Sequence, residues 1–297
     1  MTSVAPAADW VDDYLARIGA ARPASADASA LRDLQAAHVL AVPFENLSIH
    51  LGEPIVLDQA SLVAKVVKMR RGGFCYELNG AFAALLTALG FRVSLLSARV
   101  FGASGQPGPP FDHMALRVEL AEPRLVDVGF GRFSTWPLRL GFPGDQRDPA
   151  GTFRVADSPS GHGDLDVFHD GEPAYRVDPR PYALADFDRA CWWQQHSPES
   201  HFRTSLTCSI ATRSGRVTLS GDRLIVTEDG RRQERTLAGD AEILTAYRTH
   251  FGITLDRVPT IDRTLSGRTR IGVPLPRLRP LLARGMPRRC EAGARRR

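Results

Sequence analysis

Two adjacent glycines that lead directly into an apolar helical pattern constrain the fold more than any other feature of this 297-residue chain. Gly72 and Gly73 allow the backbone to turn sharply. After the turn, apolar residues recur at the three- and four-residue spacing of a buried helix face, and Gly90 is the expected helix end. The apolar residues are Leu78, Phe82, Leu85, Leu86 and Leu89. Cys75 therefore falls at a helix N-terminus.

The position of Cys75 favours a nucleophile. Exposed N–H groups and the positive end of the helix dipole can lower the pKa of a thiol placed there into the reactive range. A free cysteine is otherwise among the most buried residue types, so an inert packing role is the plainer alternative. Two ionisable residues farther along the chain favour the reactive interpretation.

Two strand-like runs, residues 111–118 and 125–131, each bring one ionisable residue into an apolar setting. A hairpin whose loop covers about residues 118–122 would put His113 directly opposite Asp127. The carboxylate would then orient the imidazole, whose other nitrogen takes the thiol proton. If each residue is considered alone, the plainer alternatives are that His113 is a packed histidine and that Asp127 caps a turn.

The hydrophobic periodicity divides the chain into three expected parts and a tail. Residues 1–90 have mostly helical patterns, residues 91–205 are rich in strands, and residues 206–265 combine short antiparallel strands with a final helix capped by Asp240. Residues 266–297 form an Arg- and Pro-rich extension that we expect to be disordered. The strands expected near and within the third part are residues 205–212, 217–219, 224–227 and 234–237.

The positive charge of the chain is concentrated in its tail. Residues 266–297 hold ten Arg and one Glu, and removing this +9 from the total of +5 leaves −4 for residues 1–265. We expect a solvated extension, and a contact with nucleic acid or a membrane surface is the alternative. No motif for reading a nucleic-acid groove supports that alternative.

The cysteines and histidines predict neither disulfides nor a metal site. The four cysteines, at positions 75, 191, 208 and 290, lack CxxC spacing, and the histidines lack metal-ligand spacing. The sequence shows no signal-peptide pattern and no apolar run of membrane-spanning length. A reducing cytoplasm is the expected location, because a thiol nucleophile needs one. Trp192 and Trp193 are expected in the core or a pocket wall.

Five separated segments resemble the arylamine N-acetyltransferase family, and together they extend over nearly the whole chain. In order they are residues 42–47, 71–80, 113–114, 126–131 and 197–202. The resemblance implies an α+β fold with a papain- or transglutaminase-like Cys-His-Asp core. It also implies an N-terminal helical bundle, a central antiparallel β-barrel-like domain and a C-terminal α/β lid.

The resemblance also implies a two-step acyl transfer. An acetyl group would pass from acetyl-CoA to Cys75 as a thioester and then to the nitrogen of an arylamine or arylhydrazine. His113 and Asp127 would complete the catalytic triad. Three further residues are expected to support the site without taking part in the chemistry: Glu45, Asn46 and Arg71.

Substrate contacts follow from the same resemblance. Phe44 and Phe130 would form an aromatic wall around the acceptor amine, and Gly129 and Gly131 would lie beside the thiol end of the coenzyme. Arg132 stands where many family members have a second glycine. A guanidinium there would either narrow the pocket mouth or hold a phosphate or carboxylate.

The expected partners are small molecules, an arylamine and an acyl-CoA, with acetyl-CoA as a co-substrate and no permanently bound cofactor or metal. We expect a monomer or homodimer with no nucleic-acid or membrane partner. Two enzymatic alternatives remain open: an amide synthase that closes a macrolactam from a carrier-bound polyketide, and a cysteine hydrolase or transglutaminase-like enzyme. A non-enzymatic binding protein on an inherited scaffold is a third, and the intact triad argues against it.

Overall fold

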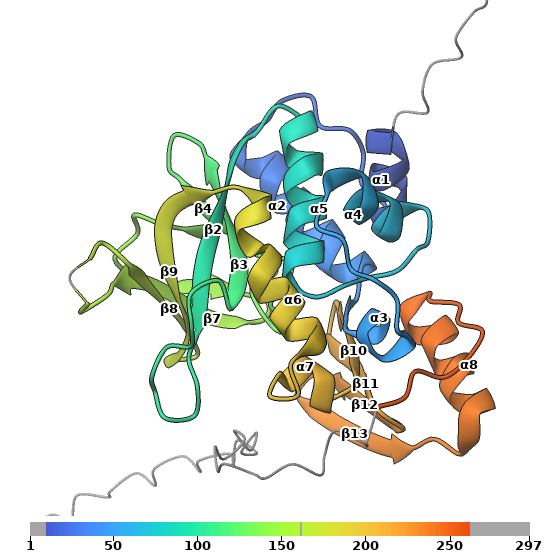
Figure 1. The fold of residues 1–297 in the computed structure, drawn as a ribbon. Helices are drawn as coiled ribbons and strands as arrows, with labels where there is room; N and C mark the ends of the chain where they lie inside the picture. The colour runs from blue at the N-terminus through green and yellow to red at the C-terminus, as the bar shows by residue number, and fades with distance from the viewer. Residues whose placement is uncertain (1–9, 161, 262–297) are drawn as a thin grey trace, which may run out of the picture.

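The computed structural model describes residues 10–160 and 162–261, which form an α+β fold as predicted. Four of the N-terminal helices, α1, α2, α4 and α5, lie together on one side of the molecule (Figure 1). No helix within the described ranges is long and apolar enough to cross a bilayer. The N-terminal helices are α1 (Trp10–Ile18), α2 (Ala28–Ala41), α3 (Leu47–Leu51), α4 (Gln59–Val67) and α5 (Cys75–Ala88).

An eight-stranded antiparallel sheet forms the centre of the molecule, in the spatial order β5-β4-β3-β2-β9-β8-β7-β6. Gln146 joins its two edge strands: it accepts a hydrogen bond from the Arg139 amide at 2.7 Å and donates one to the Arg139 carbonyl at 3.0 Å. The sheet therefore curls into a nearly closed barrel, as the family resemblance implied. Its strands are β2 (Arg92–Val100), β3 (His113–Glu119), β4 (Arg124–Val126), β5 (Leu138–Arg139), β6 (Gln146–Asp148), β7 (Gly151–Asp157), β8 (Leu165–His169) and β9 (Glu172–Tyr182).

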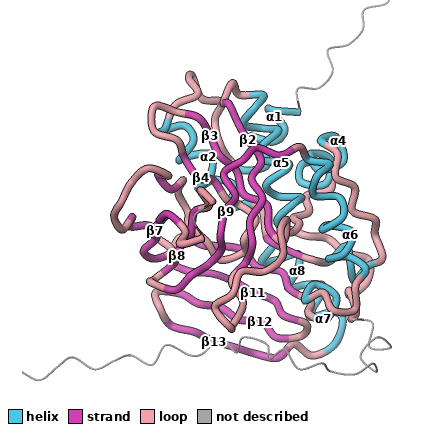
Figure 2. Tube along the Cα trace, turned by 60° about the vertical axis from the view of Figure 1, so that its left-hand side comes forward, coloured by secondary structure: helices cyan, strands magenta, loops and turns pink. Residues whose placement is uncertain are grey.

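A five-stranded antiparallel sheet and helix α8 (Gly239–Phe251) form the C-terminal part, which lies below the barrel in Figure 2. Its edge strand, β1 (Phe44–Glu45), comes from the N-terminal region, and Phe44 pairs with Ser209. Helix α8 begins at Gly239, so Asp240 lies in its first turn and does not cap it, contrary to our expectation. The remaining strands are β10 (Thr207–Thr212), β11 (Gly215–Ser220), β12 (Arg223–Glu228) and β13 (Arg231–Thr236).

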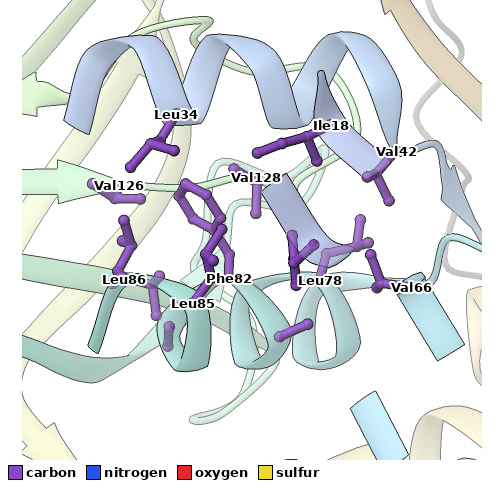
Figure 3. Close-up of a cluster of buried hydrophobic side chains, with 14 of the residues drawn as sticks. Ile18, Leu34, Val42, Val66, Leu78, Phe82, Leu85, Leu86, Val126 and Val128 are labelled. Atoms are coloured by element: carbon purple, nitrogen blue, oxygen red, sulfur yellow. The ribbon is translucent and has the colours of Figure 1, made fainter. Parts of the chain in front are cut away.

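Helix α5 lies at the centre of the main hydrophobic core. Its predicted apolar face is buried, and its close neighbours include Leu34 of α2 and Val126 at the end of β4 (Figure 3). Small and apolar residues also cover its other sides, so that nearly the whole helix is buried. Such all-round burial fixes the helix rigidly between the bundle and the barrel.

Three shorter helices connect the barrel to the C-terminal sheet: η1 (Leu184–Phe187), α6 (Asp188–His196) and α7 (His201–Thr204). Trp192 and Trp193 were expected in the core or a pocket wall, and the core placement is wrong, because these α6 side chains are 61% and 40% exposed. The division at residues 90 and 205 stays a prediction, and the tail at 266–297 lies outside the described residues.

His38 of α2 is a fully buried histidine in the main core. Its Nε2 atom lies 3.0 Å from the Tyr14 hydroxyl, and its ring centroid lies 4.9 Å from that of Phe82. Burial, with a smaller effect from the charge of Arg17, lowers the pKa of His38 to about 3. The folded protein therefore holds this imidazole neutral.

We predict that His38 makes the protein acid-sensitive. Between its ordinary pKa of 6.5 and its folded pKa of about 3, the unfolded chain binds a proton that the folded chain does not. Stability is therefore lost as the pH falls below about 6.5, by ~2 kcal/mol at pH 5. Urea denaturation at pH 7.5 and pH 5 should show a smaller loss for His38→Gln than for the wild type or the exposed control His196→Gln. Equal losses in all three proteins would contradict the prediction.

Candidate active site

Cys75 is the first residue of α5, as predicted, and Phe74 is the N-cap. The Glu77 carboxylate accepts a hydrogen bond from the Phe74 amide at 3.2 Å, which fixes the start of the helix. The turn before it requires glycine, because a Cβ atom on Gly72 would lie 1.9 Å from the carbonyl oxygen of Pro43. The chain is therefore held tightly on both sides of Cys75.

The Cys75 side chain is buried, at 3% exposed, and this changes the expected behaviour of its thiol. Burial raises the pKa of the Cys75 thiol well above its ordinary value, opposed by the backbone amide of Met114 and reinforced by the negative charges of Asp112 and Asp127. The expectation that the helix N-terminus lowers the pKa of this thiol into the reactive range is therefore wrong. Ionisation of Cys75 needs a base close to the sulfur.

His113 and Asp127 form a buried pair in which the Nε2 and Oδ2 atoms lie 2.7 Å apart. A carboxylate only accepts hydrogen bonds, so Nε2–H is the donor and Nδ1 is left to accept a proton. The strand register differs from the expected one: Leu116 pairs with Val126, so that Asp127 does not lie directly opposite His113. The shift is two residues, which keeps both side chains on one face and allows them to meet diagonally.

Cys75 lies close to residues that neighbour His113 and Asp127 in the sequence. The Met114 amide lies close enough to influence the thiol, and a Cβ atom on Gly129 would lie 2.7 Å from the Cα atom of Cys75. Within the described residues no direct hydrogen bond joins Cys75 to His113. The fold thus brings the three predicted residues to one junction, with a direct bond only between the histidine and the aspartate.

Asn79 is a site residue whose role the sequence analysis missed. It lies one helical turn after Cys75, and its side-chain amide donates to Asp127 Oδ1 at 2.9 Å and to the Met114 carbonyl at 2.7 Å. Its own oxygen accepts from the Val128 amide at 2.9 Å. The i, i+4 spacing from Cys75 is the signal that would have placed it on the same helix face.

Tyr175 of β9 is a second residue near the site that the sequence patterns did not predict. Its ring centroid lies 5.1 Å from the rings of both His113 and Phe130. Burial and the charge of Asp127 raise the pKa of the Tyr175 hydroxyl well above its usual range. A neutral aromatic wall thus encloses the imidazole, and no signal near residue 175 in the sequence points to this contact.

A cavity of about 450 Å³ opens beside Asp127 and is lined by both predicted aromatic residues, Phe44 and Phe130. Phe130 also contacts His113, with ring centroids 5.1 Å apart. Gly131 has a φ of +86°, and a Cβ atom on it would lie 3.4 Å from the Phe44 ring. The structure thus gives Gly131, like Gly129, a steric reason to be glycine.

A network of buried charges lies under the turn that precedes Cys75. Arg71 pairs with Glu45 and with Glu53, at 3.0 Å in each case. Lys65 pairs with Glu77, the residue that caps α5, at 2.5 Å. These pairs compensate the cost of burying each charge and tie α4, β1 and α5 together. The predicted support residues Glu45 and Arg71 thus lie behind the site, away from its cavity.

Asn46 joins the same region to the C-terminal part. Its side-chain amide donates to the carbonyls of Phe202 and Ser205, and its oxygen accepts from the Thr207 amide at 2.9 Å. These bonds fix β1, which positions Phe44. The described residues contain no group of three His, Cys, Asp or Glu side chains that could hold a metal ion.

This arrangement is chemically suited to nucleophilic transfer. A buried thiol lies at the start of a helix, and an imidazole oriented by a carboxylate lies beside it. The histidine can take the thiol proton through Nδ1 while Asp127 stabilises the resulting imidazolium. An aromatic cavity next to the pair can hold a second reactant.

Comparisons with known proteins agree on one family. Residues 27–260 match a protein family described as N-acetyltransferase. An arylamine N-acetyltransferase of Mycolicibacterium smegmatis is 36% identical over 254 residues, 82% of this chain and 91% of the relative. One from Escherichia coli K12 is 34% identical over 255 residues, 83% and 89% of the two chains. The structure of Mycobacterium marinum arylamine N-acetyltransferase in complex with CoA matches with a TM-score of 0.74 and 31% identity, covering 82% of this chain and 92% of that one.

We predict that Cys75 needs His113 in order to react at neutral pH. With the base removed, burial keeps the thiol protonated, so His113→Gln should slow iodoacetamide labelling of Cys75 at pH 7 by about tenfold or more, with recovery only at alkaline pH. Mass spectrometry would locate and time the labelling. His196→Gln, in an exposed part of α6, is the control. Wild-type labelling rates in His113→Gln at pH 7 would show that His113 is not the base.

Proposed function

Since the chain belongs to the arylamine N-acetyltransferase family, we propose that it transfers an acetyl group from acetyl-CoA to an arylamine or arylhydrazine through a thioester on Cys75. The contact between His113 and Asp127 at 2.7 Å, beside the buried thiol, is the observation that carries the assignment of the triad. The named relatives give no support to the amide-synthase or hydrolase alternatives.

The first step loads the enzyme. His113 Nδ1 takes the Cys75 proton as the sulfur attacks the acetyl carbonyl carbon of acetyl-CoA. The carbon–sulfur bond to the coenzyme then breaks, and the imidazolium returns the proton to the departing CoA thiolate. One thioester replaces another, so that the step has little intrinsic thermodynamic cost. Backbone N–H groups in the first turn of α5 would stabilise the negative charge on the carbonyl oxygen.

The second step unloads the acetyl group. The amine nitrogen attacks the carbonyl carbon of the Cys75 thioester, and His113 Nδ1 takes the proton that the nitrogen loses. The carbon–sulfur bond breaks, the amide leaves, and Cys75 recovers its proton. Asp127 stabilises the charged imidazole in both steps. Burial of all three side chains limits the access of water, which would otherwise hydrolyse the thioester.

The acceptor ring would lie between Phe44 and Phe130, which line the cavity beside Asp127. Flat aromatic walls suit a flat aromatic amine. Gly129 and Gly131 would leave room for the thiol end of the coenzyme, because neither adds a side chain at the junction of cavity and helix. We also propose a cytoplasmic location, since Cys75, Cys191 and Cys208 are all free thiols and the nucleophile needs reducing conditions.

The proposed function predicts amine-dependent release of CoA and acetylation of Cys75. With acetyl-CoA alone, mass spectrometry should find one acetyl group on Cys75, and aniline or a hydrazide should discharge it. Cys75→Ser should lower turnover at least a thousandfold without unfolding the protein. Cys191→Ala, which removes another buried cysteine, is the matched control and should keep its acetyl-enzyme. Normal turnover in Cys75→Ser would refute the assignment, and CoA release that does not depend on the amine would indicate a hydrolase.

A further inference from the structure

Three arginines line the cavity beside the triad, and within the described residues none has a carboxylate partner within 4.0 Å. They are Arg132, after Gly131, and Arg213 and Arg216, from the β10–β11 hairpin. Most other charged residues close to the site are paired, as Arg71 is with Glu45 and Glu53. The arginines of the cavity are therefore left with uncompensated charge.

Arg216 is the most constrained of the three. It is partly buried, and within the described residues the only hydrogen bond of its side chain is the one that Nη1 donates to the Ser209 hydroxyl at 2.9 Å. Burial and the nearby positive charge of Arg132 lower the pKa of Arg216 to about 10. Two guanidinium groups thus repel each other in a partly desolvated place. Such an arrangement is costly unless an anion lies between or beside them.

The chain does not itself provide that anion. Two carboxylates line the same cavity, Asp127 and Asp229. Asp127 is fully occupied by His113, Asn79 and the Gly129 amide. Asp229 is exposed in the β12–β13 turn and lies outside salt-bridge distance of the three arginines within the described part of the chain. A ligand is the remaining source of negative charge.

The cavity extends from the reaction centre to the arginines. Phe44, which lines the cavity, pairs with Ser209 of β10, and Arg213 follows the end of the same strand at Thr212. Ser209 and Thr212 are three residue steps apart, which corresponds to about 10 Å of extended strand. Positive charge is therefore spread along the cavity. Arg216 lies nearer the aromatic wall, and Arg213 lies at the exposed mouth.

We propose that Arg132 and Arg216, with Arg213 at the mouth, form an anion-binding subsite that holds phosphate groups of the acyl-CoA donor. This inference rests on the proposed function. Guanidinium groups bind phosphate oxygens through paired hydrogen bonds, and several arginines match the multiple negative charges of a coenzyme better than a single carboxylate. The spread of the arginines also fits a donor whose phosphates occupy more than one position. A carboxylate on the acceptor amine is the competing occupant.

The test compares two donors that carry the same acetyl thioester, acetyl-CoA and S-acetylpantetheine, which lacks the phosphates. With aniline as acceptor, Arg216→Gln and Arg132→Gln should each raise the KM for acetyl-CoA by about tenfold or more and leave that for S-acetylpantetheine nearly unchanged. Arg216→Lys should restore part of the effect, and added salt should reduce the wild-type advantage. Arg231→Gln, an exposed arginine on β13, is the matched control and should change neither KM.

Equal effects on both donors, or none in either glutamine variant, would overturn the subsite. A second arm compares aniline with 4-aminobenzoate at saturating acetyl-CoA. A loss confined to the charged acceptor would assign the arginines to the acceptor and overturn the donor assignment.

Calorimetric titration with CoA itself separates this proposal from the proposed function. Weaker binding to Arg216→Gln supports the subsite even in the absence of turnover, and equal binding refutes it. A wild type without amine-dependent CoA release would contradict the proposed function alone.

Discussion

The hydrogen bonds of Asn79 connect the helix that holds the nucleophile to the strands that hold its partners. One side-chain amide contacts the carboxylate of Asp127, the carbonyl that follows His113 and the backbone at Val128. Met114 belongs to β3, whereas Asp127 and Val128 lie in the segment just after β4, so Asn79 ties both to α5 beside the apolar packing that they share. Because all three contacts are buried, breaking any of them would leave a polar group without a partner. The geometry of the triad therefore depends on one residue that takes no part in bond making.

The charges behind the site have a complementary effect. The Lys65–Glu77 and Arg71–Glu45 pairs lie on the opposite side of the turn from the cavity. Glu77 links the two systems, because its carboxylate accepts hydrogen bonds both from the Phe74 amide and from the Lys65 ammonium group. Buried ion pairs contribute little net stability but restrict the chain to one arrangement. The thiol is thus held between these buried ion pairs and the hydrogen-bond network of Asn79 and Asp127.

Local patterns predicted the elements well, and long-range contacts account for what was missed. The glycine pair and the spacing of apolar residues placed the start of α5 correctly at Cys75, and alternation located β3. The second strand, expected over residues 125–131, is shorter: β4 covers only Arg124–Val126. The hairpin register was two residues off because the turn has no strong glycine signal to fix it. Tyr175 reaches His113 only because β9 pairs with β2, which no local pattern encodes. The raised pKa of Cys75 likewise follows from burial, which only the assembled core provides.

The pairing of β1 with β10 has a consequence for how the enzyme is made. Phe44 emerges from the ribosome early, but its partner Ser209 follows more than 160 residues later. During synthesis the helices and barrel have the opportunity to fold around Cys75 while one side of the cleft is still missing. The proposed nucleophile and base would thus be synthesised before the cavity can close, so that the order of translation separates the supply of the reactive residues from completion of the pocket.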